Sequence, residues 1–169
     1  MIRSSLILAA AFVAAALPAG AQMMSGSGAM DPGNFHYYVG TWACMAGNVG
    51  QRPMNATATF TMDAGLLREH VNVAAMGKMK YAYTLEIAQT FDPKHHRMVA
   101  TGLGNDGGYW VSYAKPWTEH TEEWVDAFNR DGLGRSETVR ESQNRFSFMD
   151  WDKTMGGKVV FKGYCTRSS

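Results

Sequence analysis

The sequence predicts an all-β fold, an antiparallel up-and-down β-barrel of about ten strands closed by a disulfide between its first and last strands. Three observations lead to this prediction. Beyond the N-terminal region, no stretch repeats apolar residues with the 3.6-residue period of a helix. Short segments rich in β-branched and aromatic residues alternate instead with Gly, Asn, Asp and Pro. The only two cysteines, Cys44 and Cys165, fall near the two ends of this strand-rich region.

The strand-rich region divides into ten segments separated by short connections. Because every connection is short, consecutive strands are expected to pair antiparallel. A short helical piece over 35–38 is expected to close one barrel end. The predicted strands are 39–47, 54–63, 66–76, 79–91, 96–104, 108–115, 119–128, 134–142, 145–151 and 158–166. The turns between them are marked by Gly77, Asp92-Pro93, Asp106-Gly107, Lys115-Pro116, Asp131-Gly132 and Gly156-Gly157.

The cysteine pair adds a geometric constraint. Two cysteines in an exported chain most simply form one disulfide, and the N-terminal pattern described below predicts export. Bridged Cα atoms must lie within about 7 Å of each other, so the first strand, which carries Cys44, must lie beside the last strand, which carries Cys165. An up-and-down barrel meets this condition by construction.

Residues 1–21 have the pattern of a signal peptide. Arg3 provides a positive start, an apolar run follows over 6–17, and Ala19-Gly20-Ala21 forms a small-residue cleavage site. The run is too short to span a hydrocarbon core of roughly 30 Å. We therefore expect a periplasmic or secreted protein, cleaved near Ala21 and without a stable membrane anchor.

The remaining residues predict one domain. Residues 22–34 are rich in Gly, Ser and Met and are expected to form a flexible leader, while 35–169 form a single barrel. About 148 residues after cleavage suffice for one core. The formal net charge is +1 with both signs interspersed, so no nucleic-acid partner is expected. The composition leaves the oligomeric state open.

A ten-stranded barrel has an interior too wide for small side chains to fill. We therefore expect a cavity that holds a small apolar or aromatic molecule, because such walls with a few polar groups are the usual lining of ligand sites. The expected lining is aromatic Phe60, Tyr83, Tyr113, Trp124 and Phe148, with His70, Glu86 and Arg145 as polar contacts.

The densest ionisable run, 119–126, suggests an alternative. As a strand it places His120, Glu122, Trp124 and Asp126 on one face. A solvated outer face is the more ordinary interpretation, but a histidine near a carboxylate also suits general acid–base catalysis in the cavity. No Gly-x-Ser-x-Gly nucleophile motif accompanies it. A third alternative is an envelope interaction or stress module without ligand, which predicts a filled barrel and an exposed apolar patch.

The start of the first strand resembles a known motif. Gly40-Thr41-Trp42, preceded by Asn34-Phe35, is similar to the Gly-x-Trp signature of the calycin group, which includes lipocalins, fatty-acid-binding proteins and nitrobindin-like barrels. Thr90-Phe91-Asp92-Pro93 resembles the Tyr-Asp-Pro turn of small exported barrel domains. The resemblance implies that Gly40 and Trp42 are structural, with Trp42 packed across the closed barrel end under a basic residue, Arg167 or Lys162.

The same resemblance raises haem as a cofactor, because nitrobindin-like barrels bind haem through a histidine near the C-terminus. This chain has no histidine after His120, although His70 could face the cavity. His95-His96-x-Met98 would suit copper, but these histidines fall in a predicted turn and Met is an ordinary gap-filling residue. No cofactor and no metal site is therefore expected.

Overall fold

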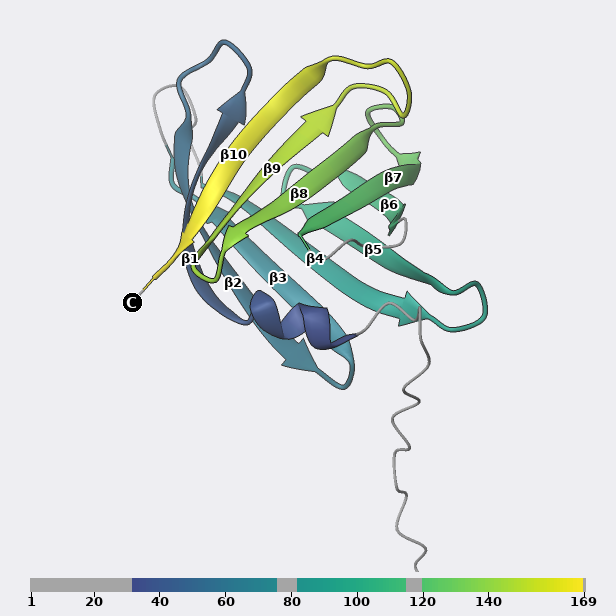
Figure 1. Ribbon diagram of the computed structural model, residues 1–169. Coiled ribbons are helices and arrows are strands. Elements are labelled where there is room, and N and C mark those ends of the chain that lie inside the picture. The colour runs from purple at the N-terminus through teal and green to yellow at the C-terminus, as the bar shows by residue number, and fades with distance from the viewer. Residues whose placement is uncertain (1–31, 76–81, 115–119, 169) are drawn as a thin grey trace, which may run out of the picture.

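Ten antiparallel strands curve around one interior and close on themselves in the computed structural model (Figure 1). The structure describes residues 32–75, 82–114 and 120–168. A short 3₁₀ helix, η1 (Pro32–Tyr37), precedes the barrel. The strands are β1 (Gly40–Asn48), β2 (Met54–Asp63), β3 (Leu66–Val73), β4 (Tyr83–Asp92), β5 (Arg97–Gly104), β6 (Tyr109–Ala114), β7 (Thr121–Asn129), β8 (Arg135–Ser142), β9 (Arg145–Trp151) and β10 (Val159–Arg167).

The predicted barrel is confirmed, with each predicted segment matching one strand to within a few residues at its ends. The helix η1 begins at Pro32, three residues before the predicted piece. The predicted signal peptide 1–21, most of the leader, and the turns at Gly77 and Lys115-Pro116 lie outside the described residues.

The barrel closes where the first strand meets the last. Strand β1 pairs with β2 on one side and with β10 on the other. Cys44 and Cys165 are direct partners in the β1–β10 register and form the predicted disulfide, with their Cα atoms 4.0 Å apart. The bond joins positions 121 residues apart in sequence, so it fastens the seam of the barrel.

The local pattern of side chains explains these strands. In β2, Ala58 and Phe60 are buried while Thr57 and Thr61 are exposed, which is the period-two alternation of a strand with one face toward a core. The turns follow the predicted chemistry, since Gly107 and Gly132 adopt φ values of 80° and 108°. A side chain would strain this backbone, whereas glycine adopts it freely.

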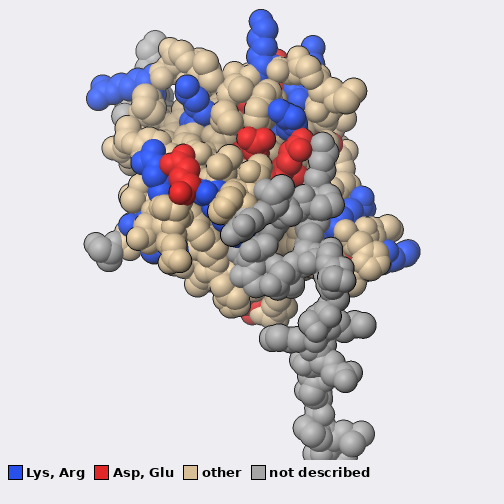
Figure 2. All heavy atoms as spheres, in the orientation of Figure 1, with Lys and Arg blue, Asp and Glu red and all other residues tan. Residues whose placement is uncertain are grey.

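The outer wall carries charges of both signs. Figure 2 shows Lys and Arg intermixed with Asp and Glu on one face of the molecule, with uncharged residues covering most of it. Four large apolar side chains are also exposed in the β5–β8 region, namely Leu103, Tyr109, Phe128 and Leu133. No helix among the described residues is long and apolar enough to cross a membrane.

Candidate functional site

A cluster of aromatic side chains closes the barrel end next to η1. Tyr38 follows η1 directly and packs against Phe60 and Phe146, with ring centroids 5.4 and 5.3 Å away. Trp42 is fully buried, and its ring centroid lies 4.9 Å from that of Phe146. The indole nitrogen of Trp42 donates to the Tyr38 carbonyl at 2.6 Å. This cluster forms the floor of the barrel interior.

Arg167 covers Trp42, as the motif resemblance implied. Its guanidinium carbon lies 4.3 Å from the centre of the Trp42 ring, within range of a cation–π contact. The same guanidinium donates to the carbonyl oxygens of Tyr37 and Val39. A Cβ on Gly40 would lie 2.9 Å from this guanidinium, so glycine leaves room for the cover. The other candidate, Lys162, is exposed on β10.

Above the floor, the barrel encloses a cavity of about 360 Å³. Its wall is mainly aliphatic and aromatic, with a few polar side chains. It extends from Tyr38 and Glu122 at the η1 end to Met54, Tyr83 and Phe161 at the opposite end. The aromatic residues of the lining are Tyr38, Phe60, Tyr83, Trp110, Trp124, Phe146, Phe148 and Phe161.

Four of the eight predicted lining residues contribute to this wall. Phe60 on β2, Tyr83 on β4, Trp124 on β7 and Phe148 on β9 all border the cavity. They come from strands spread around the barrel, so the closed sheet brings together residues that are far apart in sequence. Their contact with a ligand remains a prediction.

The other four predicted residues lie on the outer wall, which corrects the expected polar contacts. His70 and Glu86 pair with each other on neighbouring strands, with Nδ1 and Oε1 2.5 Å apart. Tyr113 lies under the Arg97 guanidinium, 3.5 Å from the ring centre.

Arg145 is the fourth of these residues. Its guanidinium donates a hydrogen bond to Glu141 and lies over the Tyr164 ring, so it is part of the outer wall and not of the cavity.

The physical reason for these errors is parity within each strand. Successive side chains point to opposite faces of a sheet. Tyr83 and Glu86 are separated by an odd number of positions on β4, as are Arg145 and Phe148 on β9, so only one member of each pair can face inward. A one-residue error in register exchanges the two faces completely.

Only part of the predicted ionisable run 119–126 borders the cavity. Glu122 and Trp124 are buried and border the cavity, whereas His120 is exposed. The interpretation of this run as a solvated outer face is therefore wrong for Glu122, which is only 3% exposed.

Glu122 is held at the cavity floor by a tyrosine and an arginine. The Tyr38 hydroxyl donates to Glu122 Oε1 at 2.7 Å, and Arg140 Nη2 donates to the same oxygen at 2.5 Å. Burial raises the pKa of the Glu122 carboxyl, while the hydrogen bond from Tyr38 and the charge of Arg140 act in the opposite direction. Burial, reinforced by the charge of Glu122, also raises the pKa of the Tyr38 hydroxyl well above its usual range.

Two further carboxyl groups, which were not among the predicted site residues, line the cavity. Burial, followed by the charge of Glu122, raises the pKa of Glu69 on β3 from 4.5 to about 8. Burial, followed by the charge of Asp126, raises the pKa of Asp150 on β9 from 3.8 to about 7. Neither carboxyl makes a hydrogen bond or ion pair with another described residue.

The sequence does contain a signal for both carboxyl groups. Glu69 shares its strand face with Leu67, Val71 and Val73, and Asp150 continues a face that begins with Phe146 and Phe148. When every second residue of a strand is apolar except for one acid, that acid is expected to face the same cavity or core as its apolar neighbours.

Trp110 borders the cavity because Gly102 leaves space for its ring. The two residues are partners in the β5–β6 register, and a Cβ added to Gly102 would overlap the indole of Trp110. The indole therefore lies across β5. The register continues from Gly102 through Ile87 on β4 to Glu69 on β3, so Trp110 and Glu69 occupy one row of the cavity wall.

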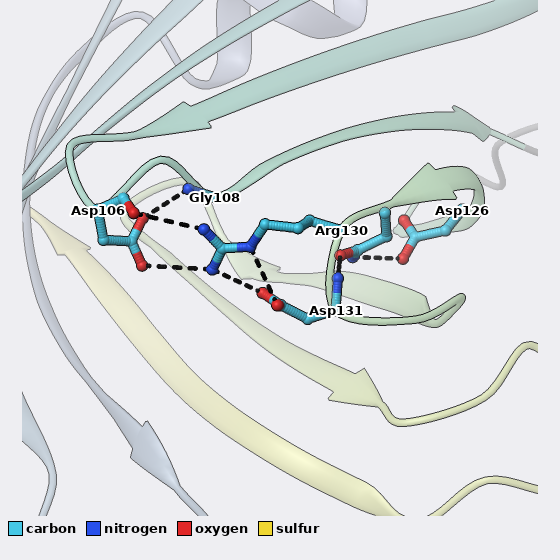
Figure 3. A network of polar contacts seen from close by, with 6 residues as sticks. Asp106, Gly108, Asp126, Arg130 and Asp131 are labelled. Atoms are coloured by element: carbon cyan, nitrogen blue, oxygen red, sulfur yellow. Dashed lines mark hydrogen bonds and ion pairs between the residues drawn. The ribbon is translucent and has the colours of Figure 1, made fainter.

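A polar network secures the barrel end opposite η1 (Figure 3). Arg130, after β7, donates to the Asp106 carbonyl at 3.3 Å and to Asp131 at 3.1 Å, so it links the β5–β6 turn to the β7–β8 turn. Asn129 donates to Asp126 at 2.9 Å, and the cavity-lining Ser112 donates to the other oxygen of Asp126 at 2.6 Å. The network thus connects the rim to the cavity wall.

The described histidines lie away from the cavity. His36, His70, His95, His96 and His120 are all exposed, so His70 cannot serve as a haem ligand inside the barrel. His95 pairs instead with Asp92 in the β4–β5 turn, with Nδ1 and Oδ2 2.6 Å apart. Within the described residues, no group of three or more His, Cys, Asp or Glu side chains has the geometry to hold a metal ion.

No protein-family model matches this chain, and no curated protein matches its sequence significantly. Among solved structures, the S-type phycobiliprotein lyase CPES from Guillardia theta is similar, with a TM-score of 0.56 and 12% identity over 81% of this chain and 92% of the lyase. The redesigned β-barrel b11L5F_LGL gives a TM-score of 0.48 and 12% identity over 80% of this chain and 95% of that barrel. At this identity the likeness to the lyase concerns the fold alone, a β-barrel.

Proposed function

We propose that this protein binds a small, largely apolar or aromatic molecule inside its barrel. The observation that carries the proposal is the cavity of about 360 Å³, whose wall is mainly apolar with a few polar groups. This volume falls within the roughly 300–1,000 Å³ of typical small-molecule sites. The phycobiliprotein lyase of similar fold supports the scaffold only, because unrelated functions share such folds.

Export and membership of the calycin group are parts of the same proposal. The N-terminal pattern of 1–21 favours export, and a disulfide such as Cys44–Cys165 persists in oxidising compartments. The Gly-x-Trp motif with Arg167 over Trp42 favours a calycin-like barrel.

The third alternative, a module without ligand, has less support. It requires an interior filled by the protein's own side chains, whereas the aromatic residues close only the floor and leave the cavity above it. Tyr109 and Phe128 do stack on the outer wall, with ring centroids 5.3 Å apart and about half of each side chain exposed.

The test is retention of a small molecule by the cavity. The purified protein is incubated with an organic extract of cells, separated from unbound compounds and analysed by mass spectrometry after denaturation. Ala56 borders the cavity, so Ala56→Phe fills part of it and should abolish retention. Thr57 is exposed on the opposite face of β2, so Thr57→Phe adds the same ring outside and should leave retention unchanged.

Two results would contradict the proposal. The first is an unmodified protein that retains nothing above the level of a non-binding control protein. The second is equal retention by both variants when circular dichroism shows that both are folded, because the retained compound then lies outside the cavity.

An enzyme using the same cavity is the second candidate. The observation that favours it is the raised pKa of Glu69, since strongly shifted carboxyl groups gather at catalytic sites. The sequence pattern suggested this chemistry on 119–126, but the Glu122 carboxylate already binds Tyr38 and Arg140, so Glu69 is the better acid. If a retained compound is chemically altered on incubation, Glu69→Gln should stop the change even when the compound is supplied at a concentration that saturates the variant. Equal turnover by the variant would contradict this role.

A further inference from the structure

The ionisable groups of the cavity wall are all acidic. Three carboxyl groups border the cavity, on Glu69, Glu122 and Asp150. Among the described residues of the lining, none is Lys, Arg or His. Glu122 has a cationic partner behind the wall, because Arg140 donates to it. Glu69 and Asp150 have no such partner among the described residues, so the cavity has two carboxyl groups available to a ligand.

These two groups lie at different depths. Glu69 is the fourth residue of β3, near the turn that enters this strand at the η1 end, and its carboxyl is close enough to feel the charge of Glu122 on the floor. Asp150 is the next-to-last residue of β9, toward the opposite end. A ligand that enters from that opposite end meets Asp150 first and Glu69 at depth.

We propose that the ligand carries a basic nitrogen on an aromatic or apolar body, and that Glu69 binds this nitrogen as an ion pair. This inference rests on the proposed function and names the class of ligand. A buried carboxyl without a partner is costly, and an ammonium group offsets that cost with a charge-assisted hydrogen bond. A neutral amine takes the proton of Glu69, whereas an ammonium ion binds after that proton has left to solvent.

The walls around Glu69 suit the rest of such a molecule. Phe60 and Ile87 are its register neighbours on β2 and β4, and both are apolar. Trp110 lies in the same row, and indole is the best aromatic partner for a cation. The charged group that acts on Glu69 is Glu122 on β7, at the floor. Glu122 in turn accepts hydrogen bonds from Arg140 on β8 and from Tyr38 after η1.

The same charge balance disfavours anionic ligands such as fatty-acid carboxylates. A carboxylate placed in this cavity would meet Glu69 and Asp150 without a lining cation to neutralise it. A buried charge without a cation is costly, and any ionised fraction of Glu69 or Asp150 adds repulsion to that cost. The ligand class is therefore set by the acidic groups, while the aromatic wall sets its apolar character.

Three naphthalene probes of similar size test this inference by calorimetry at pH 7 in about 0.15 M salt. These are 2-naphthylmethylamine, which is cationic, 2-naphthalenemethanol, which is neutral, and 2-naphthoate, which is anionic. We expect the amine to bind about tenfold or more tightly than the alcohol, as a charge-assisted hydrogen bond in a buried site implies. The naphthoate should bind most weakly.

Glu69→Gln should remove the preference for the amine and keep binding of the alcohol. Glu86→Gln is the matched control, because Glu86 lies on the neighbouring strand and faces outward toward His70, so the preference should persist.

The pH dependence of binding to the unmodified protein provides a test that does not depend on a variant. Between pH 7.5 and 5.5 the affinity for the amine should fall by up to about tenfold per pH unit as Glu69 becomes protonated, while that for the alcohol stays constant.

The outcomes separate this inference from the proposed function. Binding of the alcohol at least as tight as that of the amine, or an amine preference that survives Glu69→Gln, overturns the inference and leaves the cavity as a binding site. An affinity for the amine that does not vary with pH also overturns it. Binding of none of the three probes to the unmodified protein overturns both.

Discussion

Replacing Glu69 with Gln should stabilise the protein, and the gain should grow with pH. Gln keeps the size of the side chain but has no charge to bury. In the folded protein the pKa of Glu69 is raised from 4.5 to about 8. The folded state therefore holds a proton between these two values that the unfolded chain has released, so the free energy of unfolding of the natural protein falls as pH rises.

The magnitude follows from the same two values. A difference between 4.5 and about 8 corresponds to at most about 5 kcal/mol once the pH exceeds both. At pH 5 the unfolded chain has released about three quarters of a proton from this group, and less than about 1 kcal/mol is lost. We therefore expect the gain from Glu69→Gln to be up to about 4 kcal/mol larger at pH 9 than at pH 5.

Urea denaturation at pH 5 and pH 9 measures this difference, with the natural protein and Glu86→Gln in parallel. Glu86 forms only an exposed pair with His70, so its replacement should change the free energy of unfolding by less than about 1 kcal/mol at either pH. Asp150 titrates in both the natural protein and the variant, and its effect cancels in the comparison. A gain from Glu69→Gln that is equal at the two pH values, or a loss at pH 9, would show that Glu69 is ionised in the folded protein and would refute the reasoning.

Two further predictions concern stability. The disulfide spans 121 residues, and the chain-entropy model gives about 5 kcal/mol as the upper limit of its contribution to stability. A Cys44→Ala/Cys165→Ala double variant should therefore unfold at a clearly lower urea concentration. An unchanged unfolding midpoint would mean that the bond does not stabilise the closed barrel. Arg140→Met should cost about 3–5 kcal/mol because it leaves the Glu122 charge buried without a cation. Adding Glu122→Gln to that variant should recover more than about 1 kcal/mol in the same denaturation assay, and no recovery would mean that Arg140 acts through packing alone.

The amino-acid sequence was sufficient to predict the architecture. Period-two alternation on segments such as 54–63, glycines that adopt positive φ at Gly107 and Gly132, and short connections leave little choice but an antiparallel sheet. The cysteine pair then fixed the closure, because Cys44 and Cys165 cannot be bridged unless the first strand lies beside the last. These constraints act within one segment or between two residues, so they can be recognised in the sequence without knowledge of the folded structure.

The set of side chains that share the interior could not be predicted in the same way. Alternation shows that Tyr113 opposes Ser112, but not which of them faces inward, because that depends on how the whole sheet closes. Trp110 borders the cavity because Gly102, on another strand, leaves space for its ring.

The chemistry of the site depends on the same closure. Glu69 and Glu122 are 53 positions apart in the sequence, yet the charge of Glu122 raises the pKa of Glu69 inside the barrel. A carboxyl acquires a raised pKa only when the surrounding strands exclude water from it, and that exclusion is a property of the assembled barrel.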